Sequence, residues 1–180
     1  MTIFCIVIAI LCILYTQMYN QLVREAKQAD NAFSTVDVLL KKRYVLIPNL
    51  VNTVKGYAVH EEEIFEKLSA LRVETLSKKS CNEMVKLDNS ISSEINDVFA
   101  LAEAYPELKA SENFLALQKS LEKVEDELLA ARRTYNAAAT EYNISLDSFP
   151  TNLIGKISKL KKRELFVIED RAKDNVKIDF

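Results

Sequence analysis

Residues 3–15 read IFCIVIAILCILY, an apolar run with no charge and no strongly hydrogen-bonding side chain. A membrane span needs about 20 mainly apolar residues, and residues 1–19 are sufficient if all of them count. The backbone of a span must satisfy its own hydrogen bonds, which predicts a helix. Tyr15 and Tyr19 stand where aromatic side chains gather at a membrane surface. We therefore interpret residues 1–19 as a transmembrane anchor that contacts membrane lipid.

Other interpretations of this run fit the residues less well. A cleaved signal peptide needs a basic start and a cleavage site with small residues, whereas the first basic residue is Arg24 and residues 15–19 read YTQMY. A lipoprotein signal needs a small residue before its cysteine, and Leu11 precedes Cys12. A buried helix of a soluble protein is the remaining alternative. An uncleaved anchor is the interpretation that the residues favour.

Basic residues near the run predict the orientation of the chain. Arg24 and Lys27 follow the run closely and 41–43 reads KKR, while no Lys or Arg precedes it. Loops that carry Lys and Arg stay on the cytoplasmic side of a membrane. The expected arrangement places the N-terminus outside and the rest of the chain in the cytoplasm.

Composition predicts a single all-α domain after the anchor. The chain of 180 residues contains only 2 Gly and 3 Pro, which favours long helices joined by few turns. Its net charge of −2 gives no indication of nucleic-acid binding. Cys5 and Cys12 lie in the apolar run and Cys81 stands alone, a pattern typical of a reducing compartment rather than a disulfide framework.

Apolar residues recur at steps of three and four from Leu22 onward, which is the spacing of helices in a bundle. The expected domain, residues 20–149, is an antiparallel up-and-down bundle, and Ser111 is expected to cap its last helix. Arg43 and Glu61 interrupt the first apolar seam; we interpret them as edge positions whose charges reach water. The alternative is a polar device that fixes helix register inside the bundle. The four expected helical segments are 20–46, 49–78, 81–104 and 111–148.

Pro48 leaves the number of helices in the first half of the chain open. Proline inside a helix costs about 3 kcal/mol, and a break there gives four segments of comparable length. The apolar seam nevertheless keeps its phase across Pro48, since Leu40, Ile47 and Val54 are each seven residues apart. This favours one helix kinked at Pro48. An unbroken helix, however, leaves the stripe from Leu22 to Leu40 without an obvious partner.

Residues 150–180 form an expected basic, partly flexible tail. Residues 153–163 read LIGKISKLKKR, and a basic, partly apolar piece of this kind can lie on an anionic membrane surface. The alternative is a solvated linker. With four antiparallel segments this tail returns to the membrane, whereas one kinked first helix would leave it far away.

Several motifs, in order along nearly the whole chain, resemble those of the LemA family of bacterial membrane proteins. The stretch between residues 76 and 98 matches least. The ending Asp179-Phe180 is also similar to the family's. The resembling stretches are 46–61 (LIPNLVNTVKGYAVHE), 105–110 (YPELKA), 113–118 (NFLALQ), 131–136 (ARRTYN), 142–143 (YN) and 149–154 (FPTNLI).

The resemblance implies an anchored bundle of four helices, and so supports a break at Pro48. It also implies a short outer N-terminus and a cytoplasmic domain at the bacterial cell membrane. It brings no enzymatic activity with it. The family therefore defines the expected architecture more closely than the function.

We expect no catalytic activity, cofactor or metal. A zinc protease motif needs a second His four residues after His60, and position 64 is Ile. A dinuclear carboxylate bundle needs two Glu-x-x-His motifs, and the chain has one His. Lys78 and Lys79 could lower the pKa of Cys81, but no partner His or second Cys accompanies it. The two glycines, Gly56 and Gly155, are too far apart for a phosphate-binding loop.

Polar residues gather in the motifs, and they either fix helix register or form a surface for a partner. We favour a scaffold or docking module for an unidentified protein. The alternatives are a self-assembling homo-oligomer and, less favoured, a metal-binding or enzymatic bundle. The candidate partner surface comprises Asn49, Lys55, Tyr57, His60, Asn113, Gln118, Arg132, Arg133, Asn136 and Asn143.

Overall fold

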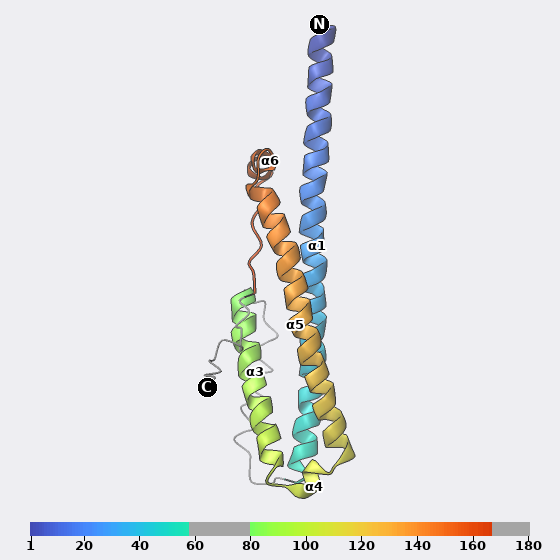
Figure 1. Ribbon diagram of the computed structural model, residues 1–180, viewed down its shortest axis with the longest axis vertical. Helices are drawn as coiled ribbons and strands as arrows, with labels where there is room; N and C mark the ends of the chain where they lie inside the picture. The colour runs from blue at the N-terminus through green and yellow to red at the C-terminus, as the bar shows by residue number, and fades with distance from the viewer. Residues whose placement is uncertain (58–79, 167–180) are drawn as a thin grey trace, which may run out of the picture.

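The protein is helical throughout the part that a computed structural model describes, residues 1–57 and 80–166. No strand occurs in these two ranges, so the expected all-α fold is confirmed. Figure 1 shows a long N-terminal helix with a bundle packed against it. The helices are α1 (Thr2–Lys55), α3 (Cys81–Ala102), α4 (Pro106–Lys109), α5 (Glu112–Asp147) and α6 (Thr151–Ile157).

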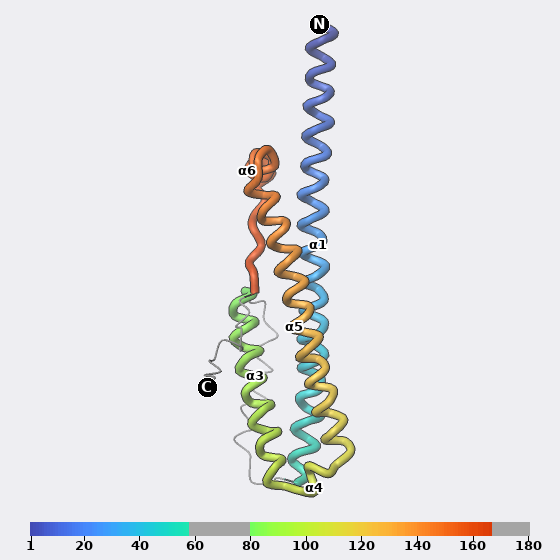
Figure 2. Tube along the Cα trace, viewed as in Figure 1, coloured from blue at the N-terminus to red at the C-terminus, as the bar shows by residue number. Residues whose placement is uncertain are grey.

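Three long helices set the arrangement of the bundle. α1 and α3 run in the same direction, and α5 runs back antiparallel to both (Figures 1 and 2). α1 and α5 form the closest pair, and α6 contacts both of them. The first turns of α1 project beyond the bundle, at the end where α6 lies. The opposite end is formed by α4 and the turns on either side of it.

α1 continues through Pro48 as one helix. Of the two alternatives left open at Pro48, the single helix is the one observed as far as residue 57, and the break into segments 20–46 and 49–78 does not occur there. Ile47, Leu50 and Val51 are buried on both sides of Pro48, and we attribute the continuity to this packing, which offsets the missing hydrogen bond. Residues 58–79, including Glu61 and most of the expected second segment, lie outside the described residues.

α5 is the partner that the Leu22–Leu40 stripe was expected to lack. Just after the apolar segment, Leu22 packs with Tyr142 of α5. Further along, the Phe33 ring meets the Tyr135 ring at 5.4 Å between centroids. Because α5 returns along the same helix, the tail begins near the apolar segment, where Ile154 packs with Leu22, even though α1 is unbroken. The expectation that one first helix would leave the tail far away is wrong.

The expected boundaries of segments 81–104 and 111–148 are accurate to a few residues, since α3 ends at Ala102 and α5 spans Glu112–Asp147. Ser80 caps α3 in a reciprocal capping box, in which its hydroxyl accepts from Glu83 N at 3.3 Å and its own N–H donates to the Glu83 carboxylate at 2.9 Å. Ser111 stands at the cap position of α5 but makes no side-chain capping bond, contrary to expectation. The short helix α4, which begins at Pro106, was not expected.

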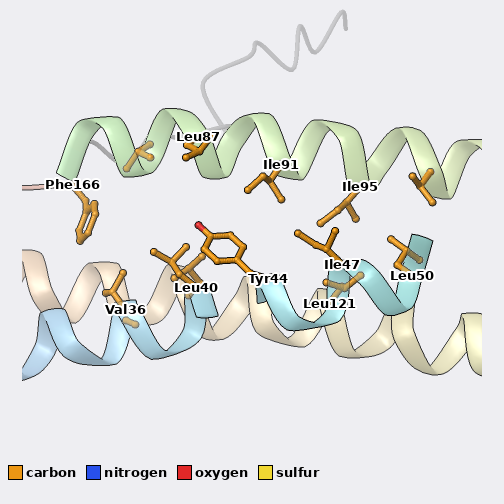
Figure 3. Close-up of a cluster of buried hydrophobic side chains, with 14 of the residues drawn as sticks. Val36, Leu40, Tyr44, Ile47, Leu50, Leu87, Ile91, Ile95, Leu121 and Phe166 are labelled. Carbon is orange, nitrogen blue, oxygen red and sulfur yellow. The ribbon is translucent and has the colours of Figure 1, made fainter. Parts of the chain in front are cut away.

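The core follows the apolar seams of three helices. Figure 3 shows side chains of α1 facing those of α3 across the bundle, with Leu121 of α5 beside them. Phe166, from the segment after α6, closes one end of this layer and is 3% exposed. Among the buried seam residues are Val36, Leu40, Ile47, Leu50, Leu87, Ile91, Ile95 and Leu121.

The N-terminal part of α1 is long and apolar enough to cross a membrane, and it is the one such helix among the described residues. None of the residues in its most apolar stretch is buried inside the protein. Ile3 and Phe4, for example, are 77% and 68% exposed. Apolar surface of this extent needs a covering that the rest of the described chain does not provide.

Candidate functional site

Two arginines and one aspartate from three helices meet inside the bundle. Arg43 of α1 donates from Nη1 to Oδ1 of Asp88 in α3 at 2.8 Å. Arg132 of α5 donates from Nη2 to the other oxygen, Oδ2, at 2.8 Å. The three residues are only 2%, 2% and 6% exposed, in the order Arg43, Asp88, Arg132. One carboxylate thus joins all three long helices.

Two further residues complete this charged cluster, which we define as Arg43, Asp88, Ser92, Glu125 and Arg132. Arg43 Nη2 donates to Ser92 Oγ at 2.8 Å, and Ser92 Oγ donates to the Asp88 carbonyl at 3.0 Å. Glu125 Oε2 lies 3.9 Å from Arg43 Nη2 and is partly exposed. Its charge offsets the excess of one positive charge that two arginines and one aspartate leave in the interior.

The charged cluster has a structural consequence that the sequence interpretation of Arg43 missed. Arg43 does not extend to water from an edge position; it is buried and paired, as in the alternative of a register device. A one-turn slip of any helix would separate buried charges, and removing one partner from such a pair costs about 3–5 kcal/mol. The cluster therefore favours a single alignment of α1, α3 and α5.

Two asparagines of α5 hold the segment after α6, residues 158–166, which we name the C-terminal strap. Asn143 donates to the Arg163 carbonyl at 2.9 Å and accepts from Arg163 N at 2.8 Å. Asn136 makes the same pair of bonds with Phe166, at 2.8 and 2.9 Å. Each amide side chain satisfies one donor and one acceptor of the strap's backbone.

The spacing of the two asparagines matches the strap. Asn136 and Asn143 are seven residues apart, a rise of about 10.5 Å on a helix. Arg163 and Phe166 are three residues apart, and extended backbone covers about 10 Å over that number. The strap can therefore run antiparallel to α5 and meet both amides without distortion.

The end of the strap connects to the core and to the charged cluster. The Phe166 ring lies 5.2 Å from the Tyr135 ring and 6.1 Å from the Phe33 ring, between centroids. Arg132 Cζ lies 5.7 Å from the centroid of Phe166, which is within the range of a cation–π contact. A displacement of the strap would therefore remove the contact between Phe166 and the Arg132 guanidinium.

A buried thiol and phenol lie beneath the strap. Tyr135 donates its hydroxyl to the Glu164 carbonyl at 2.7 Å, and Cys81 Sγ lies 3.9 Å from that hydroxyl. Burial is the main cause that raises the pKa of Cys81 and the pKa of Tyr135 above their ordinary values. Lys78 and Lys79, which could lower the pKa of Cys81, lie outside the described residues. With its pKa raised by burial, the thiol stays protonated at neutral pH.

The predicted partner residues separate into inward and outward groups. Arg132, Asn136 and Asn143 bind within the bundle as described above. Gln118 is half-buried and donates to Glu122 at 3.1 Å. His60 lies outside the described residues. The exposed members are Asn49, Lys55, Tyr57, Asn113 and Arg133.

Four of the exposed residues lie at the end of the bundle opposite the N-terminus, which we name the distal tip. Asn49, Lys55 and Tyr57 come from the end of α1, and Asn113 from the first turn of α5. α4 lies between these two helix ends (Figure 1). Arg133 stands apart from them, midway along α5. The structure thus brings residues of two motifs to one end of the molecule.

No metal site is found in residues 1–57 and 80–166, where no group of three or more potential His, Cys, Asp or Glu ligands occurs. His60, the one histidine of the chain, falls outside these ranges. Of the buried acidic residues in these ranges, Asp88 binds two arginines and Glu25 accepts a hydrogen bond from Gln21 at 2.9 Å. Sequence reasoning did not single out Asp88, Ser92 or Phe166. Asp88 directly follows a seam residue, Leu87, which is the one signal that could have indicated it.

Together these features define a class: a membrane-associated helical protein whose first helix leads from an apolar segment into a bundle held by a C-terminal strap. The chain belongs to the LemA family, whose model matches residues 32–180. This agrees with the resemblance seen in the motifs.

Curated relatives agree with this assignment. Protein LemA of Metamycoplasma hominis is 28% identical over 180 residues, covering 98% of this chain and 80% of its own length. The chain is also similar to magnetosome protein MamQ 2 of Paramagnetospirillum magneticum, 24% identical over 174 residues. Magnetosome protein MamQ of Magnetospirillum gryphiswaldense is 22% identical over 174 residues. Both of these alignments cover 82% of this chain but 64% of the magnetosome proteins, slightly less than two thirds of their length.

Proposed function

We propose that this chain is a non-catalytic, single-pass membrane protein whose bundle serves as a cytoplasmic docking module for another protein. The observation that carries the proposal is the continuity of α1. One helix contains the apolar segment together with Asn49 and Lys55 of the distal tip, and Tyr57 follows two residues after its end. A partner bound at the tip would therefore be held at a fixed height above the membrane.

The height follows from helix geometry. Residues 20–55 rise about 54 Å at about 1.5 Å per residue. Packing of α1 on α5 and the charged cluster keep this length rigid. The tip would stand clear of lipid headgroups and within reach of soluble proteins.

The composition of the distal tip suits recognition of a protein. Tyr57 is 42% exposed and Leu115, one turn into α5, is 49% exposed. Asn49 and Asn113 add amide groups that can donate and accept. Aromatic anchors surrounded by polar groups are typical of protein interfaces.

A cytoplasmic location is supported by the charges next to the anchor. Arg24 and Lys27 follow the apolar segment within two turns, and the first turn of α1 contains no acidic residue. Positive residues beside a span are retained on the cytoplasmic side. The proposal therefore places the N-terminus outside the bacterial cell membrane and the bundle inside.

The proposal assigns no catalytic role because the interior groups best suited to react, the Asp88 carboxylate and the Tyr135 hydroxyl, already have structural partners. Asp88 is shared by two arginines, and the Tyr135 hydroxyl donates to a backbone carbonyl. Both asparagines under the strap use donor and acceptor together. These groups would have to leave their partners before they could act on a substrate.

In-cell crosslinking of the full chain tests the docking proposal. A photo-crosslinking amino acid replaces Tyr57 at the tip or, as a control, Leu129, which is 38% exposed midway along α5. We expect one or a few specific products from position 57 that are absent from position 129 and disappear in the Asn113→Ala background. Equal products from both positions, or none from position 57, would contradict the proposal. Digestion of the bundle by external protease would contradict the orientation.

A self-assembling protein is the second candidate, and one observation favours it. Val38 and Val45 of α1 are 59% and 64% exposed and lie seven residues apart on one face. A second copy could cover this face. We expect a defined oligomer in detergent that Val45→Lys disrupts, and a monomer at all concentrations would rule this candidate out.

A further inference from the structure

The corner between α5 and α6 exposes large apolar side chains. Phe149, just before α6, is 80% exposed, and Leu153 and Ile157 of α6 are 52% and 72% exposed. Leu153 and Ile157 are four residues apart, so they share one face of the helix. The opposite face, with Ile154 and Gly155, is buried against the bundle. α6 therefore has two apolar faces, of which the bundle covers one.

α6 packs closely against α5 on its covered face. A Cβ atom at Gly155 would collide with Leu146 Cδ1 of α5. Thr151 at the start of α6 donates its hydroxyl to the Ser148 carbonyl at 2.9 Å. These contacts determine which face of α6 points outward. Leu153 and Ile157 are therefore exposed because α6 is packed in this orientation.

The position of α6 relates its outward face to the membrane. Ile154 packs with Leu22 of α1 and Tyr142 of α5, and Met18 of α1 is partly buried against this group. Met18 is within the apolar segment, and Leu22 lies just beyond it. α6 therefore sits at the level where α1 passes from the membrane into the bundle (Figures 1 and 2).

Basic side chains accompany the apolar face. Lys156, Lys159 and Lys161 are exposed in and after α6. Lys162 is drawn back to α5 by an ion pair with Asp147, whose Oδ2 lies 2.7 Å from its Nζ. Lysines near an anionic membrane surface are attracted to it, and their chains can extend from an interfacial helix to the headgroups.

We infer that α6 is a second membrane contact, in which Phe149, Leu153 and Ile157 enter the interfacial layer of a bilayer that contains anionic lipid. Interfacial helices insert an apolar face about 5–10 Å into the boundary between headgroups and acyl chains. The occupant is lipid because the packing of α6 on α1 already holds this face at membrane depth. This contact rests on the membrane span that the proposed function assigns to α1, but not on docking at the distal tip.

Two attachments have a consequence for the orientation of the bundle. A single span leaves a helix free to tilt, by about 20° on average. A second contact beside the span, on the α5 side of α1, restricts tilting in that direction. The bundle would then present its distal tip at a defined angle as well as a defined height.

Tryptophan fluorescence of the full chain in vesicles tests the inference. The chain contains no Trp, so Phe149→Trp and, separately, Ile157→Trp each introduce a single fluorophore at an exposed site. Leu115→Trp is the matched control, at the opposite end of the bundle. Vesicles contain phosphatidylcholine and phosphatidylglycerol, with or without lipid brominated near the top of the acyl chain. Circular dichroism confirms that each variant keeps the helical content of the wild type.

We expect emission from Phe149→Trp and Ile157→Trp to shift to shorter wavelength and to lose most of its intensity with brominated lipid. Leu115→Trp should respond only to aqueous iodide. The quenching by brominated lipid should weaken when phosphatidylglycerol is omitted or when Lys156, Lys159 and Lys161 are replaced by Gln.

Three results would overturn the inference. If iodide alone quenches Phe149→Trp and Ile157→Trp, as it does the control, the face lies in water. If neither quencher acts, another protein or a second copy covers it. If quenching by brominated lipid is unchanged without phosphatidylglycerol, the contact does not require anionic lipid.

Discussion

At the scale of single residues, Asp88 links the three long helices of the bundle, α1, α3 and α5. Its two oxygens bind arginines from two different helices, and all three residues are buried. Loss of the carboxylate would leave two guanidinium groups in the interior without their partner. A buried charge without a partner is far more costly than a missing surface pair.

We predict that Asp88→Ala lowers the free energy of unfolding by about 3–5 kcal/mol. The measurement is denaturant unfolding of the full chain in detergent, followed by circular dichroism. Asp97→Ala is the control, since Asp97 is exposed on the same helix, and a surface change of this kind stays within about 0.5 kcal/mol. Equal effects of the two substitutions would show that the charged cluster does not hold the helices.

The phenol and thiol under the strap predict a dependence on pH. Their pKa values are raised in the folded protein, so the folded state holds these protons more tightly than the unfolded state. Stability from these protons is complete below the ordinary values of 9.0 for Cys81 and 10.0 for Tyr135, and is lost as pH rises above them.

We therefore expect the free energy of unfolding to fall between about pH 9 and pH 11. Because lysines titrate in the same range, the informative quantity is the difference between the wild type and Tyr135→Phe. The fall should be smaller in Tyr135→Phe, measured by urea unfolding at each pH. A parallel fall in both proteins would exclude Tyr135 as the cause.

At the scale of elements, the apolar seams predicted the buried faces of the helices, whereas the choice between a break and one helix at Pro48 stayed open. The spacing from Leu22 onward identified the buried faces of α1, α3 and α5 because burial imposes that periodicity. Pro48 was harder, since its local cost favours a break while the buried residues on both sides favour continuity. Which of these effects wins depends on packing with distant segments, which a single sequence does not display.

Pro48→Ala tests the continuity of α1. Alanine supplies the missing N–H and removes the ring from the helix, so we expect the free energy of unfolding to rise, by at most about 3 kcal/mol. Thermal unfolding in detergent measures the change. A loss of stability would indicate that the chain needs a proline turn at this position.

The contacts of the strap could not be predicted from the sequence, for a different physical reason. Asn136 and Asn143 were noticed in the motifs, but an asparagine that binds a distant backbone looks the same in the sequence as one that binds a partner. The spacing of Asn136 and Asn143 on α5 matches that of Arg163 and Phe166 on the strap. This match can be recognised only once the positions of both segments in the structure are known. Phe166 was not singled out because its neighbours give no helical period.

We predict that Asn136→Ala, which removes both bonds to Phe166, loosens the strap without unfolding the bundle. Hydrogen exchange of the Phe166 amide should accelerate, and stability should fall by about 1–3 kcal/mol. Asn96→Ala, at an exposed position of α3, serves as the control and should leave that amide protected. Unchanged exchange in Asn136→Ala would mean that the strap is held by other contacts.

At the scale of the whole molecule, α1 joins the apolar segment to the distal tip. The docking proposal and the height of the tip both rest on one helix that runs from the apolar segment to Lys55. The family assignment agrees with this architecture but gives no partner. The polar residues of the motifs serve two purposes: some align helices and hold the strap, and others remain exposed at the tip.

The most direct test of this account is a distance along α1 in the full chain reconstituted in a bilayer. Spin labels at two exposed positions, Gln28 and Lys55, report the distance by pulsed electron paramagnetic resonance, with Cys5 and Cys12 replaced by Ala and Cys81 shielded by burial. One continuous helix predicts a single narrow distribution near 40 Å, from 27 residues at about 1.5 Å each. A distribution centred well below this value would mean that the chain turns back at Pro48, and the account of a rigid helix carrying the tip would be wrong.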